Sequence, residues 1–187
     1  MNETLKTIEE RRSTRGFTAE QLTEGELQAI LDAAVQSPTA RNTQYWHFSA
    51  VQNVELLDAF AADLAALVRG RLPEGKRGRF DEADFHVFYH APTVVFISLP
   101  VKNDNRFAEI DAGIAVENIA LAAQSMGLGS VIIGMAKDLF LTEQGEVYRR
   151  AFGFPEGYDF AIAIVIGHNT VTKEAHPVGE NKISIIR

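Results

Sequence analysis

The chain has 187 residues, a length that predicts one domain covering residues 1–187, since most domains contain about 100 to 200 residues. Its formal net charge of -7 argues against nucleic acid and against anionic membrane surfaces as main partners. The absence of cysteine excludes disulfides, thiolate metal sites and thiol redox chemistry. Residues 1–15 contain no apolar core of a secretory signal, so we expect a cytoplasmic protein.

In the first half of the chain, hydrophobic spacing predicts three helices and one strand. The first helix is short and ends near residue 13. Thr23 and Glu26 form a capping box for the second helix, which must end before Pro38 because proline disfavours helical geometry in the preceding residue. A strand over 47–52 follows, and Asn53 can cap a third helix that continues towards a basic, glycine-containing loop at 70–79.

The second half predicts more strands and a tail. The expected elements are a short helix at 81–90, a strand at 93–99, a long helix at 108–126, a strand at 130–135, a helix at 143–152 and a strand at 160–166. The polar tail ends in Ile183, Ile185 and Ile186, an apolar ending that needs a partner strand. About five strands mixed with about six helices, without strict alternation, predict an α+β sandwich rather than a Rossmann fold.

The long helix at 108–126 is apolar around most of its circumference. Its polar residues Asp111, Asn118 and Ser125 are seven apart and form a narrow seam. Such a helix must be covered on several sides, by its own core and by a second subunit. A membrane span is the rival interpretation, but Glu117 and Asn118 at mid-helix argue against it.

The first candidate site contains Arg11, Arg12, Ser13 and Arg15 at the end of the first helix. Guanidinium groups this close repel one another unless an anion lies among them, and their planar forks match phosphate oxygens. The alternative interpretation is a solvated basic turn that pairs with neighbouring carboxylates.

The second candidate is the loop from Ser37 to Trp46. Its Asn42 and Gln44 can donate and accept hydrogen bonds at once, which suits the edge of a heterocycle. The alternative is a plain helix-to-strand connection with Trp46 packed in the core.

A third candidate is the segment from Gly127 to Gly134, where Gly134 would let a ligand approach the backbone. Glycines near turns usually serve only the turn. His86 and His90 could share a metal on one helical face, but no third ligand is apparent, and we predict no metal site. The basic loop at 70–79 is either a solvated face or an attractor for a nicotinamide cofactor's phosphate.

In this order and spacing the three segments resemble the FMN-dependent nitroreductase family over nearly the whole chain. Arg11-Arg12-Ser13-Thr14-Arg15 with Phe17 looks like the family's first flavin motif, Ser37 to Phe48 its second, and Gly127-Leu128-Gly129 to Gly134 its third. The resemblance implies an intertwined homodimer with C-terminal strand exchange, a mostly antiparallel central sheet and two flavin sites at the subunit interface.

By match of position, the resemblance also implies which residues bind FMN. Arg11, Arg12, Ser13 and Arg15 would hold its phosphate, ribityl chain and pyrimidine edge, and Lys182 would return to the phosphate. Pro38, Thr39, Ala40, Asn42 and Gln44 would come from the other subunit, and Ile133 and Gly134 would lie beside the ring. The sequence departs from the family pattern at Arg41 and Tyr45, which could alter the substrates that stack on the flavin.

The resulting hypothesis is an FMN oxidoreductase without catalytic side chains of its own. NADH or NADPH would reduce the flavin and leave, and a small planar electron-poor acceptor, such as a nitroaromatic or a quinone, would then bind in a ping-pong mechanism. The alternatives are a flavin-binding sensor or interaction module without turnover, and another reaction on the same scaffold, such as dehalogenation or flavin fragmentation.

Overall fold

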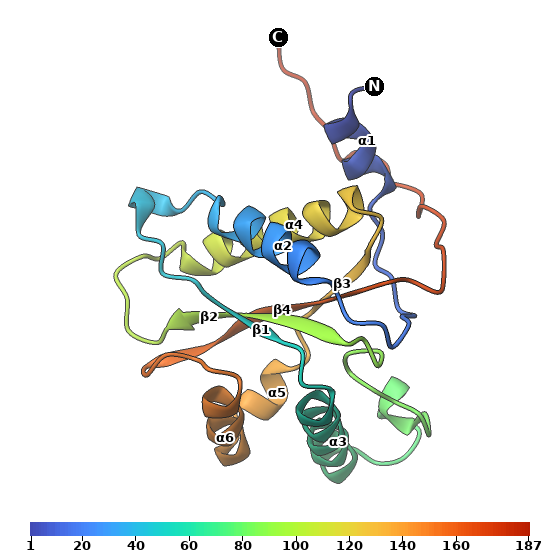
Figure 1. The fold of residues 1–187 in the computed structure, drawn as a ribbon, viewed down its shortest axis with the longest axis vertical. Helices are drawn as coiled ribbons and strands as arrows, with labels where there is room; N and C mark the ends of the chain where they lie inside the picture. The colour runs from blue at the N-terminus through green and yellow to red at the C-terminus, as the bar shows by residue number, and fades with distance from the viewer.

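A four-stranded antiparallel sheet runs through the middle of the protein, with helices on both of its faces (Figure 1). The computed structural model describes residues 1–187. The strands are β1 (His47–Val51), β2 (Thr93–Pro100), β3 (Gly129–Ile133) and β4 (Tyr158–Gly167), in the spatial order β1-β2-β4-β3. The predicted α+β sandwich is confirmed, with four strands in the chain rather than about five.

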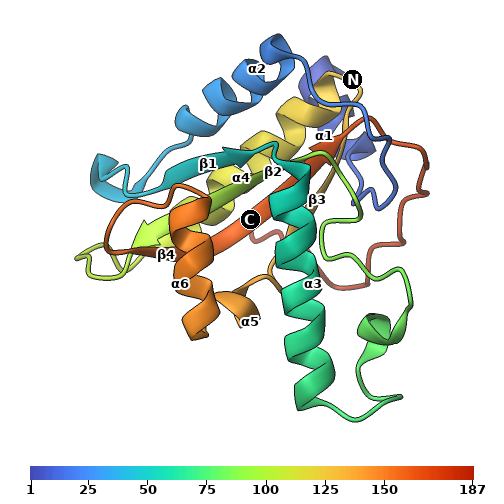
Figure 2. The ribbon, with the colours of Figure 1, turned by 60° about the horizontal axis from the view of Figure 1, so that its bottom comes forward.

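The helices form one layer on each face of the sheet, as Figure 2 shows from another side. One layer contains α2 (Glu24–Val35) and α4 (Ala108–Ser125). The opposite layer contains α3 (Val54–Arg71), α5 (Lys137–Phe140) and α6 (Glu143–Ala151). The remaining helix, α1 (Glu3–Glu10), buries none of its residues. None of these helices combines the length and the apolarity that crossing a bilayer requires.

Each face of the sheet has its own hydrophobic core, and β2 contributes to both. Val94 and Phe96 point into a cluster of 22 buried residues with α3, α5 and α6. Val95 and Ile97 point into a cluster of 16 buried residues with α2 and α4. Since successive side chains of a strand face opposite sides, a strand between two helical layers must be apolar throughout. This explains the continuous apolar run of β2.

The local signals that begin α2 and α3 are confirmed. The backbone N–H of Thr23 donates to the Glu26 carboxylate at 2.7 Å, and the N–H of Glu26 donates to the Thr23 hydroxyl at 3.2 Å. This reciprocal pair is a complete capping box at the start of α2. Asn53 caps α3 by accepting from the N–H of Leu56 at 2.9 Å. These caps fix where α2 and α3 enter the fold.

Two features of the structure differ from the sequence prediction. Residues 81–90 form turns instead of a helix, and α3 continues to Arg71, so the basic loop begins later than predicted. The buried His86 side chain accepts hydrogen bonds from two backbone N–H groups in this stretch, which stabilises a tight turn at the expense of helical bonding. The turn places Tyr89 next to the N-terminal arginines.

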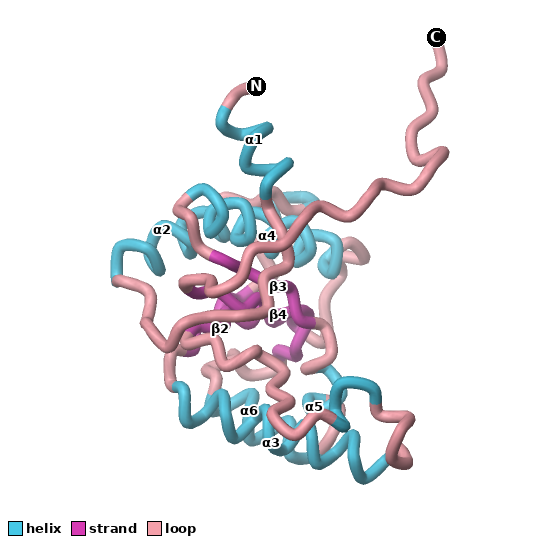
Figure 3. Tube along the Cα trace, turned by 90° about the vertical axis from the view of Figure 1, so that its right-hand side faces the viewer, coloured by secondary structure: helices cyan, strands magenta, loops and turns pink.

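The tail belongs to no strand within one chain. Ile183, Ile185 and Ile186 are 84, 75 and 96% exposed. Figure 3 shows that the tail and α1 both project from the same end of the sandwich. On α4, Ile110 is 60% and Ile114 37% exposed, whereas the opposite side of this helix is buried. The expected strand exchange and second subunit therefore stay predictions, and these exposed apolar residues are the surfaces that they would cover.

Candidate functional site

An open cavity of about 480 Å³ lies at the N-terminal arginine motif. Arg11, Arg12, Ser13 and Arg15 line one side of it, and the tail supplies Lys173, Ala175, His176 and Val178. A larger cavity of about 650 Å³ lies elsewhere, beside α6, where Arg149 is already paired with Glu146 and Asp159. The arginine cavity is the one that the N-terminal motif lines, and it gathers three arginines.

The three guanidinium groups of this cavity have different partners. Arg11 pairs with Glu117 of α4 at 3.3 Å. Arg12 turns back and donates to the carbonyls of Glu9 and Arg11, both at 2.6 Å, so it caps the C-terminus of α1. Arg15 is exposed and has no carboxylate partner. The solvated-turn interpretation thus accounts for Arg11 and Arg12, while Arg15 presents positive charge without a carboxylate partner.

The motif is fastened to β3, which carries the third candidate segment. The N–H of Thr14 donates to the carbonyl of Ser130 at 2.8 Å. The approach is close enough that a Cβ on Gly129 would lie 2.8 Å from the Thr14 side chain. From Ser130 the strand continues for four residues, about 13 Å at the usual rise, to Gly134. A flat ligand could therefore extend from the arginines along β3.

Ile133 is buried and Gly134 is exposed at the end of that strand. A Cβ on Gly134 would meet only the Ile162 side chain, at the ordinary contact distance of 3.8 Å. Gly134 is also absent from the residues with positive φ. Nothing inside the chain requires glycine here, and its exposed backbone leaves room for a group outside the chain to approach closely.

The second candidate segment forms a tight loop with an unusual backbone. The backbone φ values of Arg41, Asn42 and Gln44 are 57°, 56° and 49°. They lie in the left-handed region that residues other than glycine rarely adopt. The amide of Gln44 donates to the Asn42 side chain at 2.8 Å, and the Thr39 hydroxyl accepts from the Gln44 N–H at 3.1 Å. Strain of this kind persists only where surrounding contacts hold it, and it is common at ligand sites.

Helix α4 holds this loop through its polar seam. The buried Asp111 carboxylate accepts from the Ala40 N–H at 3.1 Å and from the Asn105 amide at 2.7 Å. Asn118 donates to the Ser37 hydroxyl at 2.9 Å. The sequence showed the polar seam of α4 but did not indicate which residues its side chains would bind. The signal was a carboxylate and an amide seven residues apart on an otherwise apolar helix.

The two departures from the family pattern, Arg41 and Tyr45, share one partner. Arg41 forms an ion pair with Asp104 at 3.2 Å, and the Tyr45 hydroxyl donates to the same carboxylate at 2.8 Å. The Tyr45 hydrogen bond and the Arg41 charge lower the pKa of Asp104, and this bond raises the pKa of Tyr45. The three groups form one exposed polar cluster beside the strained loop.

The remaining residues of the second segment contribute backbone and small side chains. Pro38 is exposed, and Thr39 and Ala40 are half-buried. Trp46 packs against Phe48, with ring centroids 5.0 Å apart, and its buried indole nitrogen has no hydrogen-bond partner. For Trp46 the core-packing interpretation is correct.

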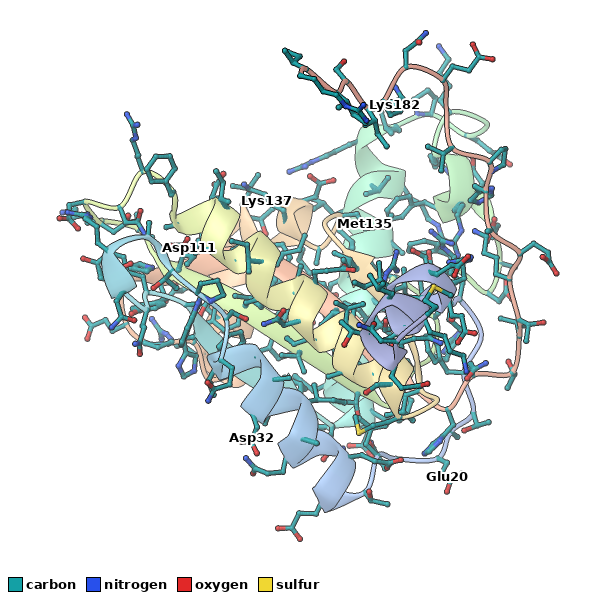
Figure 4. All side chains as sticks on the ribbon, turned by 90° about the horizontal axis from the view of Figure 1, so that it is seen from above. Glu20, Asp32, Asp111, Met135, Lys137 and Lys182 are labelled. Carbon is teal, nitrogen blue, oxygen red and sulfur yellow. The ribbon has the colours of Figure 1, made fainter.

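The first and second segments do not meet within one chain. Figure 4 shows Asp111, which holds the second segment, well away from Lys182 in the tail. Figure 1 likewise separates α1 from the loop that follows α2. Lys182 is exposed and is not among the residues that line the arginine cavity. Its predicted contact with the phosphate stays a prediction.

The two histidines considered as metal ligands acquire a third neighbour in the fold. Asp58 of α3 lies beside them, and the ligand atoms of Asp58, His86 and His90 lie within 4.8 Å of one another. Both His86 nitrogens are engaged, however: Nδ1 accepts from the N–H groups of Phe88 and His90, and Nε2 bonds the Asp58 carboxylate at 3.1 Å. Neutral imidazole then has no lone pair for an ion, so we assign His86 a structural role.

The fold and the cavity define a class: an α+β sandwich with an arginine motif fixed to one strand and a strained polar loop at the other end of the molecule. The nitroreductase family model matches residues 8–168, and the chain belongs to that family.

Solved structures of the same fold carry a flavin. A nitroreductase with bound FMN from Desulfitobacterium hafniense is 35% identical, with a TM-score of 0.92 and full coverage of both chains. A nitroreductase with bound FMN from Bacteroides fragilis is 28% identical, with a TM-score of 0.90 and full coverage of both chains. Among curated relatives, an NADPH-flavin oxidoreductase from Vibrio harveyi is 28% identical over 95% of this chain and 70% of its own length.

Proposed function

We propose that the protein is an NAD(P)H-dependent FMN oxidoreductase that reduces planar electron-poor acceptors such as nitroaromatics or quinones. The observation that carries this proposal is the arginine motif, which lines an open cavity, contains one arginine without a carboxylate partner, Arg15, and is hydrogen-bonded to the strand that leads to Gly134. FMN, when bound, supplies the electron transfer from NAD(P)H to the acceptor, with the two substrates alternating at one face of its ring in a ping-pong order.

The residues present fit the parts of FMN. Arg11 and Ser13 suit a phosphate, because an arginine fork and a hydroxyl donate to phosphate oxygens. Arg15 suits the electron-rich pyrimidine edge, where a fixed positive charge favours added electrons. Ile133 is a buried apolar residue beside the exposed Gly134, and together they would offer the ring a flat approach.

The second segment would complete the site from another copy of the chain. Pro38, Thr39, Ala40, Asn42 and Gln44 lie away from the arginine cavity in their own chain. A homodimer would bring them to the arginine motif of the partner and would cover Ile110 and Ile114 of α4. The C-terminal isoleucines would add to the partner's sheet, and Lys182 would approach a phosphate. The small side chains at 38–40 leave room for substrates above the ring.

The first test is the visible absorption spectrum of the purified protein after FMN loading and desalting. We expect retained flavin absorbance that bleaches with NADPH or NADH without oxygen and returns when a quinone or nitroaromatic is added. Rapid mixing should resolve the two halves of the reaction in the absence of the other substrate, as a ping-pong order requires. Flavin that neither nicotinamide bleaches would contradict the oxidoreductase proposal, and no retained flavin would contradict the FMN site.

A further inference from the structure

Tyr89 joins two arginines at the edge of the candidate site. Its hydroxyl oxygen accepts from Arg15 Nε at 3.2 Å and also from the guanidinium of Arg79. The Arg79 guanidinium lies 4.6 Å from the centre of the Tyr89 ring, a cation–π distance. Since each hydrogen bond spans about 3 Å, the two positive groups lie within about 6 Å of each other.

A buried turn holds Tyr89 in place. Tyr89 and His90 both have φ near +55°, which is strained for residues with side chains. The N–H groups of Phe88 and His90 both donate to His86 Nδ1 at 3.2 Å. His86 is 6% exposed, and its other nitrogen bonds Asp58 of α3. Burial and the neighbouring His90 lower the pKa of His86, which favours the neutral ring that can accept these bonds.

Most other arginines of the basic stretch are engaged locally. Arg69 donates to the carbonyls of Phe80 and Glu82, and Arg77 donates to the carbonyl of Leu72. Arg79 differs because it reaches Tyr89, while its nearest carboxylate, Glu82, is 3.7 Å away and exposed. Its charge is therefore directed towards Arg15 and is only weakly compensated.

We propose that Tyr89 and Arg79 are positioning residues that act through Arg15 and raise the preference of the site for reduced over oxidised FMN, with His86 holding the turn that presents Tyr89. This inference rests on the proposed function. Tyr89 fixes the direction of the Arg15 guanidinium, and Arg79 adds a second positive charge behind it. Reduction adds negative charge to the pyrimidine edge, so both effects favour the reduced form over the oxidised form.

The experiment measures the reduction potential of protein-bound FMN by equilibration with reference dyes. Tyr89→Phe removes only the hydroxyl, and Arg79→Gln removes the second charge together with the contacts of Arg79 to Tyr89. We expect each to weaken the preference for reduced FMN about tenfold, which lowers the two-electron potential by about 30 mV. The matched control is Arg71→Gln, which removes the same charge from the end of α3, where the side chain is exposed and makes no hydrogen bond or ion pair.

Two variants of His86 test the turn. In His86→Asn the amide oxygen takes roughly the place of Nδ1 and can still accept from the turn, so the potential should remain near that of the wild type. In His86→Leu the acceptor is lost, and the potential should fall as in Tyr89→Phe. If His86→Leu does not fold, the potential of His86→Asn, compared with that of Tyr89→Phe, still decides whether an acceptor at this position is enough to hold the turn.

A measurement without FMN separates this inference from the proposed function. Arg15 Nε–H should exchange with solvent more slowly in the wild-type protein than in Tyr89→Phe, as followed by nitrogen-15 NMR, because the hydroxyl accepts from it. Equal exchange rates would overturn the positioning role even if FMN binds. Equal potentials for wild type and Tyr89→Phe, or equal shifts in Arg79→Gln and Arg71→Gln, would also overturn it. A wild-type protein that retains no FMN would overturn the proposed function and the tuning role with it, while slow Arg15 exchange would still support the geometry.

Discussion

Replacement of Asp111 by alanine tests how α4 holds the strained loop. The carboxylate is 5% exposed and accepts from the Ala40 N–H and the Asn105 amide. Asp111→Ala leaves the half-buried Ala40 N–H without its acceptor and leaves the buried Asn105 amide with the Thr43 hydroxyl alone. A fully buried unpaired donor costs about 1 to 3 kcal/mol, so two such donors would cost about 2 to 6 kcal/mol in the free energy of unfolding, and we expect a loss in the lower half of that range because Ala40 is half-buried.

The assay is urea unfolding at one fixed protein concentration, because association with a second chain would make the apparent stability depend on concentration. Glu109→Ala is the matched control. It removes a carboxylate from the first turn of the same helix, but Glu109 is exposed and makes no hydrogen bond or ion pair. Its effect should stay within about 0.5 kcal/mol.

The loop can also respond by detaching and exposing its donors to water. The stability loss would then fall towards the lower bound, and the apparent FMN affinity would fall instead, since part of the site would no longer be preformed. Equal stability and equal FMN affinity in Asp111→Ala and Glu109→Ala would refute the claim that this carboxylate holds the loop.

Three further substitutions test other parts of the account. Thr23→Ala should cost about 1 kcal/mol of unfolding free energy at neutral pH, because it removes the cap of α2. The hydrogen bonds from Thr23 lower the pKa of Glu26. Their contribution to stability is therefore present above the unfolded pKa of Glu26 and is lost as pH falls through its folded pKa. Urea titrations should show a smaller stability difference between wild type and Thr23→Ala at pH 3 than at pH 7. Tyr148→Phe should cost about 1 to 2 kcal/mol in the same assay, since the Tyr148 hydroxyl donates to the Asp63 carboxylate of α3 at 2.7 Å, whereas no loss would mean that this bond adds nothing to stability. Gly129→Ala should weaken FMN binding by pushing the arginine motif off β3, because the added Cβ would lie 2.8 Å from the side chains of Thr14 and Asn169. Gly25→Ala, whose added Cβ would have nothing within 4 Å, is the control. Equal FMN affinities of the two variants would contradict the close packing.

The elements that the sequence predicted best are those with local signals. Thr23 and Glu26 specify a capping box within four residues, and Pro38 limits the helix that follows. The continuous apolar run of β2 indicated burial on both faces before any partner was known. Such features depend on neighbours along the chain, so a single sequence contains them.

The elements that were missed depend on long-range contacts. Residues 81–90 have helical spacing of His86 and His90, but His86 accepts from two backbone groups and bonds Asp58, which lies 28 residues earlier. Tyr89 contacts Arg15 across 74 residues. No local pattern indicates such pairs, because only the fold brings them together.

The candidate site falls between these cases. The arginine motif and Gly134 could be singled out from residue type and from resemblance to a family, and the structure places the motif on a cavity and on β3. The partners that hold the second loop, Asp111 and Asn118, were visible only as a polar seam on α4. The left-handed backbone of Arg41 could not be predicted, since its residue type gives no sign of it.

The most direct test of the central claim asks whether one FMN site is built from two chains. Two variants are co-expressed with different affinity tags: Arg11→Glu, which places a negative charge in the arginine cavity, and Asp111→Ala, once its lowered FMN affinity has shown that the second loop is released. Each variant alone should bind FMN poorly. If the site is shared, a purified mixed dimer has one site with both defects and one intact site, and should hold about one FMN per dimer. A mixed dimer without FMN, or failure of the two tagged chains to associate, would contradict a shared site.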